Sequence, residues 1–223
     1  MIEHEAPPLL LTGVEKSLIR GAGWSRSWRG GEVLFAEGDA PEGVVLIEGG
    51  VVKATSNARN GYTSLLALRG PGELVGELAC IDGRPRSATV IAMREVRGTA
   101  VAADRFLRLL AENGPLALSV TRIVSVRLRQ ANRLRALQGA LPTTARVARV
   151  LLDLSLGHGT GDGRSPTDRV VLVSQTELAG AAGTSRESVV RALRLLQESR
   201  LITTSRGRIL VHDPEALGRW SGH

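Results

Sequence analysis

Short apolar runs separated by turn residues predict an all-β domain in the first half of the chain. Glycine-containing turn signals lie between the runs, and Asn60-Gly61 is the strongest two-residue hairpin signal among them. Short strands at this even spacing predict a sandwich, a barrel or a roll. The apolar runs are Val33–Phe35, Val44–Ile47, Gly50–Ala54, Ser64–Leu68, Ala88–Ala92 and Gly98–Ala102.

The hydrophobic pattern becomes helical after Asn113-Gly114. Pro115 suits the first turn of a helix, and apolar residues then recur at steps of three and four along two stripes. We therefore predict one helix over 115–141. Two stripes favour a helix that packs on its own domain and on a second copy; an amphipathic helix buried on one side is the alternative. The stripes are Leu116, Val120, Ile123, Leu134, Leu137 and Leu141, and Ala117, Val124, Leu128 and Ala131.

A further helix is predicted from Thr143 or Thr144, either of which can serve as its N-cap, to Leu156. A loop rich in glycine, serine and aspartate (157–168) and a strand at Val170–Val173 follow it. The chain thus divides into an N-terminal domain (1–114), a long helix (115–141) and a C-terminal domain (142–223).

Two short helices joined by a glycine dominate the C-terminal domain. Ser174-Gln175-Thr176-Glu177 is a capping box that opens a helix over Gln175–Ala182. Gly183 permits a sharp turn, and Thr184 or Ser185 caps a second helix over Arg186–Glu198. A hairpin (Leu201–Thr204 and Arg208–Val211) and a weak tail helix end the pattern.

Charge separates the two halves of the chain. The net charge is +7, yet residues 1–114 hold 13 Lys and Arg against 14 Asp and Glu, whereas residues 115–223 hold 16 Arg against 8. A basic half beside a neutral half indicates a polyanion-binding domain joined to a second function.

The second short helix has the composition of a DNA-recognition helix. One face is apolar, and the opposite face carries Arg186, Glu187, Arg191 and Arg194. Arginine can bond guanine, and glutamate can accept a hydrogen bond from cytosine. Arg206 and Arg208 at the hairpin tip could touch phosphates, as a wing does. The alternative is an ordinary solvated face, in which Glu187 serves the cap and pairs with Arg191.

A possible nucleotide cradle lies in the β-rich half. Gly76-Glu77-Leu78 predicts a helix start, where free backbone N–H groups favour an anion. Arg86 supplies a planar cation suited to phosphate, Ser87 adds a hydroxyl, and Glu77 can accept from a sugar hydroxyl. Phosphate and sugar together point to a nucleotide, although surface Glu and Arg are common without a ligand.

These motifs carry a family resemblance over roughly residues 25–212. The segment 76–90 resembles the phosphate-binding cassette of cyclic-nucleotide-binding domains in its Gly-Glu-Leu, its Pro-Arg and the following Ser-Ala. Gly31-Glu32-Val33, Gly38-Asp39 and Gly49-Gly50-Val51 resemble that family's roll glycines. The segment Ser185–Arg191 resembles the recognition helix of the cyclic-AMP receptor protein (Crp–Fnr) family of transcription regulators.

The resemblance implies an α+β fold: a cyclic-nucleotide-binding β-roll of jelly-roll type, a long dimerisation helix and a winged helix-turn-helix. It implies a homodimer that binds double-stranded DNA at a TGTGA-like palindrome, responds to cyclic AMP and works with RNA polymerase. Glu77 would hold the ribose, and Arg86 and Ser87, with the amides of Gly76 to Leu78, the phosphate. The DNA contacts would come from Ser185, Arg186, Glu187, Arg191, Arg206 and Arg208.

Two residues depart from the family's pattern on the long helix. Ala131 and Asn132 stand where the cyclic-AMP receptor protein has adjacent Thr and Ser facing the adenine. Alanine cannot hydrogen-bond a base, whereas Asn132 can donate and accept. We therefore rank cyclic AMP first, another cyclic nucleotide second and a regulator without ligand control third.

Other functions have less support in the sequence. A nucleotide-binding module acting on a protein partner, as in kinase regulatory subunits, needs neither the helix-turn-helix nor the basic half. We expect no enzyme and no metal site, because neither catalytic sets nor close-spaced histidines occur. Cys80 is expected in the core, and Trp24 and Trp28 in packing or on a partner surface. Without a signal-peptide pattern or a membrane-length apolar run, the expected location is the cytoplasm.

Overall fold

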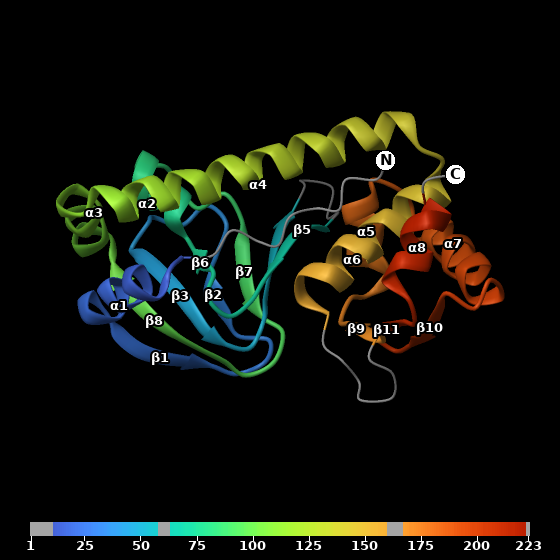
Figure 1. Cartoon of the computed structure of the whole chain (residues 1–223), viewed down its shortest axis with the longest axis horizontal. Helices are drawn as coiled ribbons and strands as arrows, with labels where there is room; N and C mark the ends of the chain where they lie inside the picture. The colour runs from blue at the N-terminus through green and yellow to red at the C-terminus, as the bar shows by residue number, and fades with distance from the viewer. Residues whose placement is uncertain (1–10, 58–62, 160–166, 222–223) are drawn as a thin grey trace. The chain divides into compact units, whose positions relative to one another are not determined.

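The computed structural model describes residues 11–57, 63–159 and 167–221 (Figure 1). The chain forms two compact units: residues 1–56 with 67–131, and residues 57–66 with 132–223. The predicted hairpin tip Asn60-Gly61 and the side chain of Leu137 lie outside the described residues.

The β-rich half of the chain forms two four-stranded sheets. One sheet has the order β1 (Trp24–Trp28), β8 (Val96–Ala102), β3 (Gly43–Gly49) and β6 (Leu74–Val75). The other has the order β2 (Val33–Phe35), β7 (Thr89–Ala92), β4 (Val52–Asn57) and β5 (Thr63–Arg69). The pairing of β1 with β8 is antiparallel from Trp24↔Ala100 to Trp28↔Val96. The β-rich N-terminal fold predicted from the sequence is confirmed.

Strand β3 separates two apolar cores because its side chains alternate between the two faces of its sheet. Val45 and Ile47 pack with Trp28 and residues of the other sheet in the interior of the roll. Val44 and Leu46 face the opposite way and join the core beneath the helices. The central strand therefore reads as a continuous apolar run rather than an alternating one.

That second core lies beneath α1 (Gly13–Ala22), α3 (Ala103–Glu112) and the first part of α4 (Gly114–Ala140), and Cys80 joins it as predicted. The predicted stripe residues Leu116, Val120 and Ile123 of α4 are buried there. A six-residue helix, α2 (Glu77–Asp82), begins at the predicted helix start. None of the helices in the described residues is long and apolar enough to span a membrane.

The all-β prediction for the first half was incomplete, because α1 and α3 and the strands β1 and β6 were not foreseen. A signal for α1 exists in the sequence: Thr12 accepts from the Glu15 N–H, and the Glu15 carboxylate accepts from the Thr12 N–H, which is a capping box. Strand β1 exposes four of its five residues, so it lacks the apolar run by which the predicted strands were found.

The second unit contains α5 (Thr143–His158), α6 (Gln175–Ala182), α7 (Arg186–Glu198) and α8 (Pro214–Ser221). Strands β10 (Ile202–Ser205), β11 (Arg208–Val211) and β9 (Arg169–Val171) form a sheet in the order β10-β11-β9. Helix α5 packs against the other three helices. The N-cap prediction for α5 was wrong: Pro142 is the N-cap, with no side-chain cap, and Thr143 is already helical.

Candidate functional site

The predicted cradle is built on a left-handed glycine at the start of α2. Gly76 is the N-cap of α2 with φ = 87°. A Cβ on Gly76 would lie 2.9 Å from Arg86 Nη1 and 2.9 Å from Phe35 Cε2. Both the backbone angle and the close approach of these two side chains therefore require glycine.

We expect Gly76→Ala to lower the free energy of unfolding by about 2–4 kcal/mol, since it adds overpacking to the strain of a positive φ. Gly83 ends α2 and is a matched control, because its φ is 69° and a Cβ there would meet nothing within 4 Å. Gly83→Ala should cost only about 1–2 kcal/mol, for the strain alone. Urea denaturation compares the two, and equal losses would contradict the close packing around Gly76.

Arg86 is buried in this cradle beside uncharged partners. Its side chain is 5% exposed; Nη1 donates to the Gly76 carbonyl at 2.9 Å, and Nη2 donates to the Gly43 carbonyl at 2.7 Å. Its Cζ lies 4.0 Å from the centroid of the Phe35 ring. Burial raises the pKa of the adjacent Cys80 thiol, so this group is also neutral.

Among the residues that the structure describes, none forms an ion pair with Arg86. A buried cation is normally paired, because removing a charge from water costs free energy that neutral partners only partly offset. The cradle therefore has the electrostatics of an anion site.

Glu77 directly follows Gly76 in the chain and, unlike Arg86, forms an ion pair. It is 3% exposed, and its Oε1 accepts from Arg127 Nη1 of α4 at 2.6 Å. Arg127 Nη2 also donates to the Leu74 carbonyl at 3.0 Å and lies 3.5 Å from Glu73 Oε1. Glu73 in turn lies 3.5 Å from Arg69 Nε.

This cluster balances two cations with two carboxylates, in contrast to Arg86. Burial lowers the pKa of Arg69 to about 10, which still leaves it charged at neutral pH. Arg127, placed between the apolar stripes in the sequence, was given no role there. The structure shows that it joins the long helix to the first residue of α2. A cation surrounded by apolar positions on a long helix is the signal that could have found it.

Four predicted ligand residues have no such contacts in the described residues. Leu78 and Ser87 flank the cradle with exposed side chains, and Ala131 and Asn132 follow one turn beyond Arg127 on α4, also exposed. The structure thus brings together Gly76, Glu77 and Arg86 and adds Phe35, Gly43 and Arg127. The roles of the other four stay predictions.

The helix-turn-helix predicted for the second unit is confirmed in its local geometry. Ser174 Oγ accepts from the Glu177 N–H at 3.2 Å, and Glu177 Oε2 accepts from the Ser174 N–H at 2.8 Å. Gly183 turns the chain with φ = 60°. Of the two proposed caps for α7 the structure selects Ser185, whose Oγ accepts from the Ser188 N–H at 3.2 Å.

Helix α7 buries one face and exposes the other, as predicted. The buried residues are Val189, Ala192, Leu193 and Leu196, and the exposed ones include Arg186, Glu187 and Arg191. The ion pair between Glu187 and Arg191, one part of the solvated-face alternative, is not formed: Arg191 Nη2 donates to Ser188 Oγ at 2.9 Å. The exposure of these charged side chains fits both a solvated face and a DNA-binding face, so the DNA contacts stay predictions. Hydrogen bonds to its own N–H and to Ser185 lower the pKa of Glu187, which keeps its carboxylate an acceptor.

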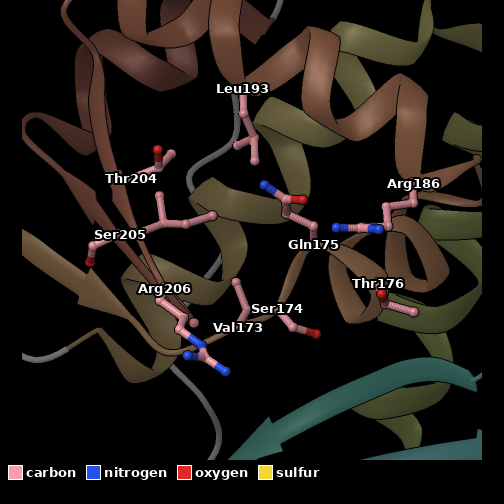
Figure 2. A pocket seen from close by; sticks show the side chains of 11 residues that line it. Val173, Ser174, Gln175, Thr176, Arg186, Leu193, Thr204, Ser205 and Arg206 are labelled. Atoms are coloured by element: carbon pink, nitrogen blue, oxygen red, sulfur yellow. The ribbon is translucent and has the colours of Figure 1, made fainter.

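A hollow of about 370 Å³ lies between the start of α6, α7 and the hairpin tip (Figure 2). Figure 2 shows the Arg186 guanidinium pointing toward Gln175, whose own amide points away from Arg186, and Arg206 lines the hollow from the hairpin. Two guanidinium groups and the N-terminal amides of α6 make this concave surface electropositive, as contact with a phosphate backbone requires. Gln175 and Thr176 had not been singled out as site residues in the sequence.

The hairpin tip has the form predicted for a wing. Gly207 turns it with φ = 68°, and Arg206 and Arg208 are exposed. We expect Arg206→Ala to weaken binding to all DNA sequences alike and to reduce the salt-dependence slope by about one unit, because one phosphate contact is lost. The measurement is fluorescence anisotropy on duplexes from low to high salt. Arg219→Ala on α8 is the control, and an unchanged slope in Arg206→Ala would show that the tip does not touch phosphate.

A ligand cradle in a β-roll, followed by a winged helix-turn-helix, defines a class of ligand-regulated DNA-binding proteins. Two family models match in that order: the cyclic nucleotide-binding domain at residues 25–113 and the Crp-like helix-turn-helix domain at residues 145–220. The chain belongs to the Crp–Fnr family of transcription regulators.

Its relatives agree with this assignment over most of their length. The chain is 31% identical over 192 residues to the CRP-like cAMP-activated global transcriptional regulator of Mycobacterium tuberculosis, covering 85% of this chain and 84% of the relative. It is 31% identical to the cyclic AMP receptor protein of Thermus thermophilus, covering 84% and 83%.

The structure of the c-di-GMP-responsive global regulator CLP of Xanthomonas campestris has the same fold. The TM-score is 0.76 at 23% identity, covering 90% of this chain and 99% of that one. The fold class and the family predicted from the sequence are confirmed, and the chain is a DNA-binding transcription regulator with a cyclic-nucleotide-binding domain.

Proposed function

We propose that this protein is a homodimeric regulator whose binding to a TGTGA-like DNA palindrome is controlled by cyclic AMP held in the cradle. The main support for an anionic ligand is the environment of Arg86, a buried cation whose partners are two carbonyls, a ring and a thiol. A cyclic phosphate carries one negative charge, which would complete that arrangement.

The proposed contacts follow the chemistry of the cradle. Arg86, Ser87 and the amides of Gly76 to Leu78 hold the phosphate, while Glu77 accepts from the ribose 2′-hydroxyl. Since Glu77 is bonded to Arg127 on α4 through Oε1, a ribose held by the same carboxylate would be linked through it to the long helix. Ala131 and Asn132 on the same helix would face the base.

The division into a ligand domain (1–114), a dimerisation helix (115–141) and a DNA-binding domain (142–223) belongs to this proposal. Leu118 and Leu128 of α4 are 50% and 61% exposed, which favours cover by a second copy along the long helix. A dimer would present two α7 helices to the two halves of a palindrome. RNA polymerase is the proposed protein partner.

The second candidate retains the DNA function with a different ligand. Ala131 offers no hydrogen bond to a base, and CLP, which shares the fold, is described as c-di-GMP-responsive. Cyclic GMP, c-di-GMP or the absence of ligand control are therefore the alternatives to test.

Calorimetry with cyclic AMP, cyclic GMP and c-di-GMP, followed by DNA binding with and without each nucleotide, tests the proposal. We expect micromolar binding of cyclic AMP, tighter binding to the palindrome in its presence, and a dimer mass by light scattering. 2′-Deoxy cyclic AMP should bind more weakly, and this difference should vanish in Glu77→Ala, which has no side-chain acceptor for the 2′-hydroxyl. Equal DNA affinity with and without every nucleotide would contradict ligand control while leaving the DNA function intact.

A further inference from the structure

Phe35 packs directly against the guanidinium group of Arg86. The ring centroid lies 4.0 Å from Arg86 Cζ, a stacking distance for a cation over an aromatic face. The chain makes room for this contact by omitting a side chain at Gly76, where a Cβ would lie 2.9 Å from Phe35 Cε2. Strand β2 thus supplies the ring that packs against the Arg86 guanidinium. The carbonyls of Gly43 in β3 and Gly76 at the start of α2 accept its hydrogen bonds.

These contacts leave Arg86 one way to bind an anion. A guanidinium has five N–H groups in one plane; here Nη1 and Nη2 each give a hydrogen to a carbonyl, Nη1 also lies 4.0 Å from Cys80 Sγ, and the Phe35 ring covers one face. An incoming phosphate oxygen must therefore bond the remaining N–H groups in the guanidinium plane. The orientation of that plane decides which oxygen is reached.

We propose that Phe35 is a positioning residue for the phosphate of the nucleotide: it fixes the plane of Arg86 and thereby selects between the two exocyclic phosphate oxygens. The inference rests on the proposed function of the cradle. Immobilising a long side chain on binding costs free energy, and a stacked guanidinium is already immobilised before the ligand arrives. Phe35 does not itself touch the phosphate in this proposal.

The test uses cyclic AMP and its two phosphorothioate diastereomers, each of which replaces one exocyclic oxygen by sulphur. Calorimetry on the full chain gives affinities for wild type, Phe35→Leu, Phe35→Tyr and Leu34→Ala. Leu34 is the matched control, because it is partly buried beside Phe35 in the roll core and is not among the hydrogen-bond or ring partners of Arg86 in the described residues. We expect wild type to prefer one diastereomer.

Phe35→Leu should bind cyclic AMP three- to tenfold more weakly and lose most of that preference, since one rotamer-rich side chain must then be ordered on binding. Phe35→Tyr, which keeps the ring, and Leu34→Ala should keep both affinity and preference. A loss shared equally by Phe35→Leu and Leu34→Ala, or a preference that survives in Phe35→Leu, would overturn the positioning role. A wild type that does not discriminate the diastereomers would overturn it as well.

A double-mutant cycle with Arg86→Lys separates this inference from the function on which it rests. A lysine ammonium has no plane to orient, so Phe35→Leu should cause no further loss in that background. Additive losses would show that Phe35 acts on the fold rather than through Arg86. If Arg86→Lys itself bound every nucleotide as wild type does, the cradle would be wrong and the inference with it.

Discussion

Arg86→Ala is expected to weaken cyclic-nucleotide binding severely while the protein stays folded. Removing one partner of a buried charged contact costs about 2–5 kcal/mol, which corresponds to a loss of about thirtyfold to several thousandfold in affinity. The effect should be the largest of any single change in the cradle, because Arg86 is its one buried cation without an ion pair in the described residues. Calorimetry with cyclic AMP measures it.

Two further variants separate the loss of the Arg86 charge from a loss of the fold. Arg84→Ala removes an exposed arginine two residues away and should bind as wild type. Arg86→Gln keeps an amide donor for the carbonyls of Gly76 or Gly43 without the charge, so it should fold and still fail to bind. Thermal unfolding checks the fold of each protein. Wild-type affinity in a folded Arg86→Gln variant would reject the phosphate role of Arg86.

Glu187→Ala is expected to relax DNA selectivity at one base pair of each half-site. Glu187 is exposed near the start of α7, and its lowered pKa keeps the carboxylate ionised at neutral pH, so it can accept from a cytosine N4 amino group. Discrimination at that position should fall by roughly ten- to a hundredfold, with smaller changes elsewhere. Competition binding against duplexes carrying every single-base change in the half-site measures this.

Glu198→Ala provides the control from the same helix. Glu198 is an exposed glutamate at the end of α7, where its Oε1 accepts from Arg194 Nε at 3.1 Å. This variant should leave selectivity unchanged. A uniform loss of affinity across all duplexes in Glu187→Ala would indicate a role in the electrostatics of the backbone contact or in the helix cap rather than in base reading.

The elements of the DNA-binding region could be predicted from the sequence because their signals are local. The Ser174 to Glu177 capping box, the Gly183 turn and the apolar face of α7 each depend on residues three or four positions apart. The cradle's glycine and its two charged residues were found in the same way. Strands β1 and β6 were missed, since one is largely exposed and the other has two residues.

The order of the motifs, the family and the residue types of both sites follow from the amino-acid sequence alone. Only the tertiary structure shows which residues of the cradle bond to one another. Arg86 donates to the carbonyl of Gly43, 43 residues away, and Glu77 accepts from Arg127, 50 residues away. It also shows that the Phe35 ring packs against the Arg86 guanidinium, and that position 76 must lack a Cβ because a Cβ there would clash with both side chains. Hydrogen bonds of caps and turns are fixed by backbone geometry over a few residues, whereas partners on separate strands and helices are set by sheet registry and core packing, which no short sequence pattern encodes.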